Sequence, residues 1–280
     1  MPKVKVNDIQ MYYEVKGEGF PLVMITGRGE NLDSWDPRLV KGLSRKFKLI
    51  LFDNRGAGRT DMSDRNYTIK LFADDTKGLM NALGISKAHI LGHSMGGMIA
   101  QELVLNYPEK VAKLVLCSTL SQLGYFNQDV SRLDSALKEG ASWEEATRMI
   151  LSFEVARDFP SDLVKKNPLL VFYCTADFFK ENPDSWNNYV KRAAKHPISK
   201  KAYTGQINAL EKFDTHNRLW QIKVPTLILQ GRKDFGLPPK AGSILAEGIP
   251  NAKLVYLEKS SHYLVEEMEE MLKVITEFLL

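Results

Sequence analysis

Short apolar runs recur in the first 120 residues of the chain and again near its end. The runs are LVMIT at 22–26, LILFD at 49–53, HILG at 89–92, LVLCST at 114–119, TLILQG at 226–231 and KLVYLE at 253–258. Nearly continuous apolar runs of this length are typical of parallel strands that are covered on both faces. At the start, Ile9, Met11, Tyr13 and Val15 recur at every second position after Asn7-Asp8, which predicts an antiparallel hairpin with one buried face.

Helical patterns lie between these runs. Thr68 is a suitable N-cap for a helix that ends near Gly84, and Pro108 marks the end of a helix that begins just after Ser94. Strands and helices that alternate in this way predict an α/β fold with a doubly wound, mostly parallel sheet.

The alternation stops at about residue 120 and resumes at about residue 224. Between these points Ser142-Trp143-Glu144-Glu145 forms a capping box that opens a helix, and no convincing buried strand is present. We therefore predict a core domain formed by residues 1–119 and 223–280, with a helical cap inserted at 120–222.

Aromatic residues are concentrated in the inserted segment, which holds 14 of the 27 in the chain. Two interpretations remain open and are compatible: the aromatic side chains form the segment's own core, or they line a substrate pocket beneath a lid. The candidate pocket residues are Phe126, Trp143, Phe172, Phe178, Phe179 and Trp186.

Composition and charge exclude several classes of protein. With 44% hydrophobic residues, 26% charged residues and a net charge of +4 over 280 positions, the chain resembles an ordinary globular protein and not one that binds nucleic acid. No apolar run is long enough for a membrane span or a signal peptide, so we expect a cytoplasmic protein. Cys117 and Cys174 are expected to be buried thiols, and the dispersed histidines give no metal-binding spacing.

Residues 90–98 read ILGHSMGGM, which is an apolar strand, a glycine-rich turn and the start of a helix. The centre of this stretch, Gly92-His93-Ser94-Met95-Gly96, fits the pattern G-x-S-x-G and resembles the nucleophile elbow of the α/β-hydrolase superfamily. In that family the serine occupies a strained strand-to-helix turn with its hydroxyl exposed. The resemblance implies that Ser94 is a nucleophile. Glycine is expected at positions 92 and 96 because a side chain at either position would crowd the turn.

A serine nucleophile needs a base, and the base needs an orienting acid. In the resembled family the order is Ser, then Asp or Glu, then His, and here Asp234 follows the run 226–231 while His262 follows the run 253–258. Because the carboxyl ends of parallel strands share one edge of a sheet, the three residues can converge. Taken singly, each residue also has a purely structural interpretation: Asp234 could serve to cap a turn, and His262 could serve to cap the last helix. The rival acid is Asp129, and the rival bases are His89, His93, His196 and His216.

The loop ITGRGENLDSW at 25–35 resembles the family's His-Gly-x segment, which supplies one oxyanion donor. The resemblance implies that the backbone N–H groups of Met95 and Arg28 form the oxyanion hole. Thr26 stands where the family usually has histidine. Gly27-x-Gly29 does not continue as a dinucleotide fingerprint, because Leu32 occupies the third glycine position, so no nicotinamide or flavin cofactor is expected. FDNRGAGRTD at 52–61 resembles another structural turn of the family, with Thr60 in place of serine.

The resemblance implies a capped serine esterase or enol-lactonase-like enzyme, which cleaves a carboxylic ester or lactone of a small apolar substrate through an acyl-enzyme and needs no cofactor or metal. C–C bond hydrolases and cofactor-free haloperoxidase-like members use the same triad, and a small-molecule receptor on the same fold is an alternative of another class. The expected partner is a small molecule and neither nucleic acid nor a membrane, and the oligomeric state is left open.

Overall fold

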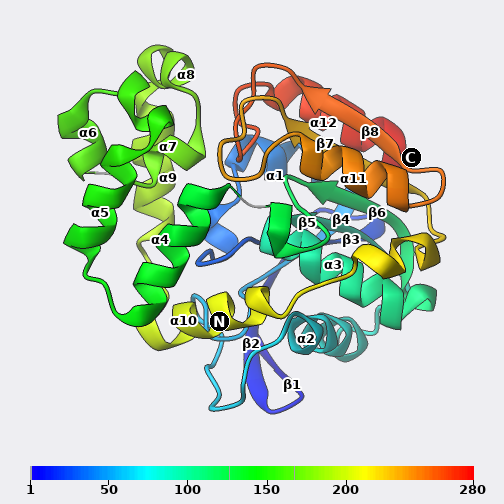
Figure 1. Ribbon diagram of the computed structural model, residues 1–280. Helices are drawn as coiled ribbons and strands as arrows, with labels where there is room; N and C mark the ends of the chain where they lie inside the picture. Colours follow the sequence, from blue (N-terminus) through cyan, green and yellow to red (C-terminus); the bar gives the residue numbers. More distant parts are fainter. Residues whose placement is uncertain (1, 126, 167) are drawn as a thin grey trace.

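The computed structural model describes residues 2–125, 127–166 and 168–280 (Figure 1). The described residues form an eight-stranded sheet in the order β1-β2-β4-β3-β5-β6-β7-β8. Its strands are β1 (Lys3–Val6), β2 (Ile9–Lys16), β3 (Phe20–Ile25), β4 (Phe47–Phe52), β5 (Ala88–His93), β6 (Val111–Cys117), β7 (Thr226–Gly231) and β8 (Lys253–Leu257). The pairs β1–β2 and β2–β4 are antiparallel, and the remaining pairs are parallel.

Helices connect the parallel strands and fill the long segment between β6 and β7. They are α1 (Pro37–Leu43), α2 (Ile69–Ala82), α3 (Met95–Asn106), α4 (Gln128–Glu139), α5 (Trp143–Ser152), α6 (Ser161–Lys166), α7 (Leu170–Tyr173), α8 (Ala176–Glu181), α9 (Pro183–Ala193), α10 (Lys200–Glu211), α11 (Lys240–Gly248) and α12 (Met268–Leu279). Short 3₁₀ turns are η1 (Leu32–Ser34), η2 (Pro108–Lys110), η3 (Leu123–Tyr125), η4 (Glu154–Asp158) and η5 (His216–Gln221).

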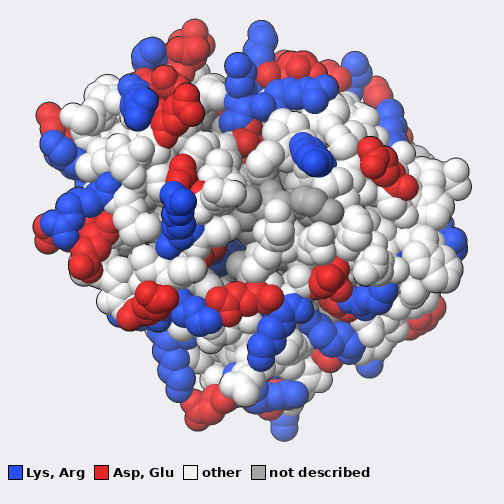
Figure 2. Space-filling view, in the orientation of Figure 1, with Lys and Arg blue, Asp and Glu red and all other residues white. Residues whose placement is uncertain are grey.

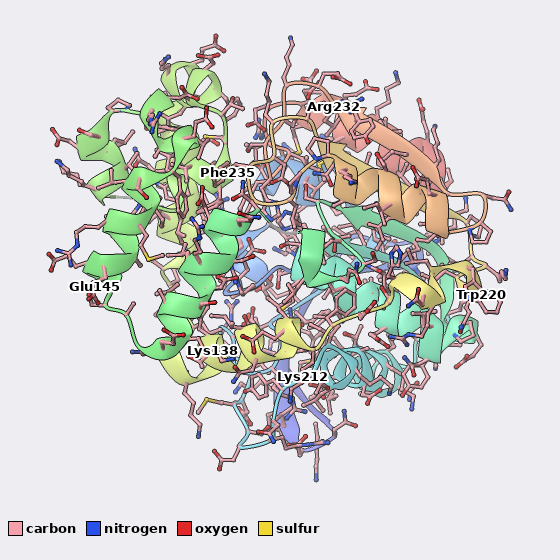
Figure 3. All side chains as sticks on the ribbon, viewed as in Figure 1. Lys138, Glu145, Lys212, Trp220, Arg232 and Phe235 are labelled. Atoms are coloured by element: carbon pink, nitrogen blue, oxygen red, sulfur yellow. The ribbon has the colours of Figure 1, made fainter. Side chains whose placement is uncertain are left out.

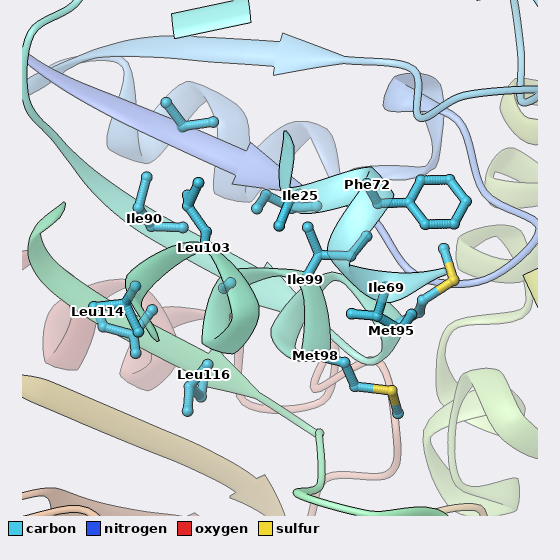
Figure 4. Packing of buried hydrophobic residues seen from close by; sticks show 14 of the residues in the cluster. Ile25, Ile69, Phe72, Ile90, Met95, Met98, Ile99, Leu103, Leu114 and Leu116 are labelled. Atoms are coloured by element: carbon cyan, nitrogen blue, oxygen red, sulfur yellow. The ribbon is translucent and has the colours of Figure 1, made fainter. Parts of the chain in front are cut away.

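Helices α2, α3 and α11 cover one face of the sheet, and α1 and α12 cover the other. Successive side chains of a strand point to opposite faces, so along β3 Val23 and Ile25 join the core under α3, while Leu22 and Met24 join the core on the other face. Figure 4 shows the side chains of α3 packed over the central strands. The apolar runs are therefore buried on both sides, and the predicted doubly wound, mostly parallel sheet is confirmed.

Local signals in the sequence account for where the first elements begin and end. Asn7 takes a φ of +52° in the turn between β1 and β2, and Thr68 caps α2 by accepting a hydrogen bond from the N–H of Leu71 at 3.0 Å. Gly84 has a φ of +68° just after that helix. One detail of the predicted hairpin is wrong: Val15 is 44% exposed, because the last residues of β2 run beyond the buried part of that strand.

Helices α4 to α10 form a separate group beside the carboxyl ends of the parallel strands, coloured green to yellow in Figure 1. We call this group the cap helices. An isolated β-bridge between Gln122 and Asp214 links the two ends of the segment. Lys138 of α4 bonds to Glu211 of α10 at 2.7 Å. In Figure 3 the labelled Phe235, in the loop after β7, lies next to the cap helices, where its ring packs against Phe153 with a centroid distance of 5.6 Å.

The surface carries both signs of charge. Figure 2 shows Lys and Arg side chains interspersed with Asp and Glu over the visible face, without one extended patch of a single sign. Among the described helices none has the length and apolar character needed to cross a membrane. Cys117 and Cys174 are free and buried, as expected from the sequence.

Candidate active site

Ser94 lies in the turn that joins β5 to α3. Its φ of +54° and ψ of −120° place it in a region that residues with a side chain rarely adopt. The turn is held by the N–H of Ser94, which donates to the carbonyl of Cys117 at 2.9 Å. A Cβ at position 92 would lie 2.3 Å from the carbonyl oxygen of Gly96, and a Cβ at position 96 would lie 2.1 Å from that of Ile25. Both glycines are therefore required for the close approach of strand, turn and helix.

Asp234 and His262 meet in the loops that follow β7 and β8. The Nδ1 of His262 lies 2.8 Å from Oδ2 of Asp234, and the Asp234 carboxylate is fully buried. Its other oxygen, Oδ1, accepts the N–H of Leu237 at 2.9 Å, and the amide of Gln230 donates to Oδ2 at 3.2 Å. The acid is therefore held from three sides, and one of its oxygens faces the imidazole.

Of the rivals for these roles, Asp129 and His89 lie away from the cavity, whereas His93 borders it beside His262. The Asp129 side chain is 38% exposed and pairs with Arg132 on the surface of α4. His89 packs between Phe20 and Phe47, where burial lowers its pKa to about 4. The ring of His93 lies beside that of His262, with a centroid distance of 4.9 Å, and its Nε2 is bonded to the backbone carbonyl of His262.

The loop after β3 passes close to Ser94, since a Cβ at position 27 would lie 3.3 Å from Cβ of Ser94. The N–H groups of Arg28 and Met95 donate no hydrogen bond within the part of the chain that the structure describes. The N–H of Gly27 is already used, because it donates to Glu30. Both predicted oxyanion donors therefore remain available, and both residues line the cavity at Ser94.

Two cap helices hold the same loop. The Arg28 guanidinium forms an ion pair with Asp134 of α4 and lies 5.5 Å from the ring centroid of Tyr203 of α10. The N–H of Gly29 donates to Oε1 of Gln206, also in α10, at 2.7 Å. Beneath the loop Asn54 donates to the carbonyl of Thr26 at 3.3 Å. This hydrogen bond holds the backbone at Thr26, the residue that stands where the family usually has histidine.

A cavity of about 550 Å³ lies between the cap helices and the carboxyl ends of the strands, and Ser94 and His262 both line it. Most of its remaining wall is apolar. The contributing side chains include Met98, Val130, Leu133, Ile150, Phe172 and Trp186. A concave site of this size with a few convergent polar groups suits a small organic molecule.

The six predicted pocket residues divide into three groups. Phe172 and Trp186 line the cavity. Phe178 and Phe179 do not, because both belong to the short outer helix α8: Phe179 packs against Phe159, and Phe178 borders a separate surface groove. Phe126 lies outside the described residues, and so does the side chain of Trp143.

Comparison with known proteins identifies the family. The family model for the alpha/beta hydrolase fold matches residues 21–268. The chain belongs to the α/β-hydrolase fold family. One relative, the "Putative carbamate hydrolase RutD" of Azorhizobium caulinodans, is 28% identical over 94% of this chain and 91% of its own length. Another, 2-hydroxy-6-oxo-6-phenylhexa-2,4-dienoate hydrolase of Comamonas testosteroni, is 26% identical over 98% of this chain and 92% of its own length.

Among solved structures, the enol-lactonase from Burkholderia xenovorans LB400 has a TM-score of 0.82 at 24% identity, with 99% of each chain covered. This likeness shows that the two chains share one fold over almost their whole length.

Several residues of this α/β-hydrolase site were missed from the sequence. Val130, Leu133 and Leu137 line the cavity, and their spacing of three and four positions on one helix was a usable signal of an inward apolar face. Glu30 and Tyr263 also line the cavity. They lie within the two loops already singled out, but nothing in the local pattern distinguishes a buried carboxylate or phenol from a solvated one.

Proposed function

We propose that this α/β-hydrolase is a serine hydrolase that cleaves a carboxylic ester or lactone of a small, largely apolar substrate through an acyl-enzyme. The observation that carries the proposal is the 2.8 Å contact between His262 Nδ1 and the buried Asp234. His262 lines the same cavity as Ser94, which is held in a strained turn. Nucleophile, base and orienting acid then come from three loops at one edge of the sheet.

In the proposed reaction the Oγ of Ser94 attacks the substrate carbonyl, and Nε2 of His262 takes up the serine proton. Asp234 holds the imidazole in the tautomer with a proton on Nδ1 and stabilises the imidazolium that forms. The N–H groups of Met95 and Arg28 donate to the oxyanion of the tetrahedral intermediate. His262 then returns its proton to the leaving alkoxide, and a water activated by the same imidazole releases the acid from Ser94.

Cleavage of a C–C bond is a second candidate, since the Comamonas relative is named for a hydrolase of a dienoate and is similar over 98% of this chain. The two activities are separated by offering p-nitrophenyl esters, lactones and vinylogous 1,5-diketones to the same preparation. A receptor on this fold would turn over none of them and would show only a ligand-dependent shift in thermal stability.

Covalent labelling tests the nucleophile directly. A fluorophosphonate should label the parent protein once and at Ser94, and Ser94→Ala should abolish labelling and reduce kcat by about 10⁶-fold while the protein stays folded. Ser118→Ala is a matched control, since Ser118 is buried at the end of β6 and also has a positive φ, but does not line the cavity. Undiminished labelling of Ser94→Ala would show that Ser94 is not the nucleophile.

A further inference from the structure

A buried carboxylate lies at the base of the loop that carries the proposed oxyanion donor. Glu30 is only 7% exposed, and its Oε2 accepts the N–H of Gly27 at 2.7 Å. Gly27 precedes Arg28 and is the residue of this loop that would touch Ser94 if it carried a Cβ. Glu30 therefore fixes the backbone that aims the Arg28 N–H towards the cavity.

His93 faces this carboxylate from the other side. Its Nε2 lies 3.0 Å from the carbonyl oxygen of His262, and because a carbonyl can only accept, Nε2 carries a proton. Its Nδ1 lies 3.7 Å from Oε2 of Glu30. Both ring nitrogens thus face an acceptor, an arrangement that favours the doubly protonated imidazolium.

The surroundings favour charge on both partners. Burial opposes ionisation of Glu30, but His93, the nearby Tyr263 hydroxyl and the Gly27 N–H outweigh it and hold the pKa of this carboxyl below its usual value. Burial likewise opposes the imidazolium of His93, but Glu30, the His262 carbonyl and Asp234 outweigh it and raise the pKa of His93.

Two phenols close the site on the side of the cap. The hydroxyl of Tyr263 lies 2.9 Å from that of Tyr189 in α9. Burial, together with the charge of Glu30, raises the pKa of Tyr263 well above its usual value, so this phenol stays neutral and able to donate. Glu30 and His93 are therefore the charged members of this cluster.

The same region has room for a water molecule. Three buried polar atoms have no hydrogen-bond partner within the described residues, namely Glu30 Oε1, Ser34 Oγ and Trp35 Nε1. Their residues, with His93, line a cavity of about 30 Å³ behind the site. A buried water needs roughly 10–15 Å³ and two to four polar partners. The cavity is therefore large enough for a water molecule that could donate a hydrogen bond to Oε1 of Glu30.

We propose that Glu30 and His93 form a buried ion pair that positions the oxyanion loop after β3 and the catalytic histidine loop after β8 relative to Ser94. This inference rests on the proposed function for its catalytic consequence. Both are positioning residues, since Glu30 acts through the N–H of Gly27 and His93 acts through the carbonyl of His262. A buried ion pair contributes little net stability compared with an apolar pair of the same size, so its main effect is on geometry.

The test is Glu30→Gln, which keeps the size of the side chain and an acceptor for Gly27 but removes the charge. We expect kcat on a p-nitrophenyl ester to fall about tenfold while KM stays within twofold, because charge-assisted hydrogen bonds are roughly twice as strong as neutral ones. The rate of fluorophosphonate labelling should fall in parallel. In an NMR titration of the imidazole nitrogens, the pKa of His93 should fall, because Glu30 is one of the groups that raise it.

Glu102→Gln is the matched control, since Glu102 is also buried and pairs with Arg218 outside the cavity. It should lower thermal stability and leave kcat unchanged. The proposal is overturned if Glu30→Gln keeps kcat within twofold, if Glu102→Gln loses as much kcat as Glu30→Gln, or if the His93 pKa does not move.

Should Glu30→Gln fail to fold, His93→Gln breaks the same pair from the other side and is read by the same kinetic assays. The NMR titration does not depend on turnover. If the parent protein shows a raised pKa of His93 but is not labelled by a fluorophosphonate, the proposed function is rejected and the ion pair is supported. Failure of the proposed function and failure of the ion pair are therefore distinguishable.

Discussion

Asp234→Asn tests the proposed triad directly, because a side-chain amide cannot satisfy all the contacts of the Asp234 carboxylate in either of its two orientations. One oxygen of Asp234 accepts the N–H of Leu237, and the other faces His262 and the amide donor of Gln230. An asparagine carbonyl turned towards Leu237 directs its NH₂ group at His262 and Gln230. The opposite orientation sets the NH₂ group against the Leu237 N–H.

The first orientation keeps the backbone hydrogen bond and donates to Nδ1 of His262. The imidazole must then carry its proton on Nε2, the nitrogen that should accept the proton of Ser94. We expect kcat to fall by about 10³ to 10⁴, which corresponds to about 4 to 5.5 kcal/mol of transition-state stabilisation. KM should change little, because Asp234 does not border the cavity.

The measurement is kcat and KM on a p-nitrophenyl ester, with thermal unfolding of the same preparation to establish that the variant is folded. Asp129→Asn serves as the control, since Asp129 is the rival acid and pairs with Arg132 on the surface. If Asp234→Asn retained most activity while Asp129→Asn lost it, the assignment of the acid would be refuted.

Two further predictions concern the cavity and the core. Over p-nitrophenyl esters from acetate to palmitate, kcat/KM should rise about fourfold per methylene, from about 0.8 kcal/mol for each buried CH₂, and then reverse once the cavity of about 550 Å³ is full; a rise that continues to palmitate would contradict an enclosed site. Arg55→Ala should lower the free energy of unfolding in urea by about 3–5 kcal/mol, because it leaves the buried Asp75 without its charged partner; a loss below about 1 kcal/mol would show that this ion pair is not needed.

The parts of the molecule that could be predicted from the sequence are those determined by interactions between residues close together along the chain. The strand, turn and helix around Ser94 follow from an apolar run and glycines within ten residues, and the cap on α2 follows from Thr68 and its neighbours. Asp234 and His262 required more than local pattern. Their assignment depends on the resemblance to the α/β-hydrolase superfamily, which implies an acid and then a histidine after the serine. Each of the two follows a strand run, and parallel strands bring their carboxyl ends to one edge of the sheet.

Contacts between distant segments had no such signal. Arg28 and Asp134 are 106 positions apart, and their pairing depends on how α4 docks on the core. Phe178 and Phe179 belong to the aromatic-rich segment like Phe172, but the orientation of the short helix α8 turns them away from the cavity. Composition indicated that a pocket could form there and carried no information on which aromatic side chains face it.

The contacts of Arg28 with Asp134 and of Gly29 with Gln206 have a consequence for engineering. They attach the loop of a proposed oxyanion donor to α4 and α10, so the helical segment does not behave as a detachable specificity module. A chimaera that received residues 120–222 from another α/β-hydrolase would lose both anchors of this loop and would change turnover together with substrate choice. Grafts on this scaffold should retain an acidic residue at position 134 and an amide at position 206, and vary the apolar wall formed by Val130, Leu133 and Ile150 instead.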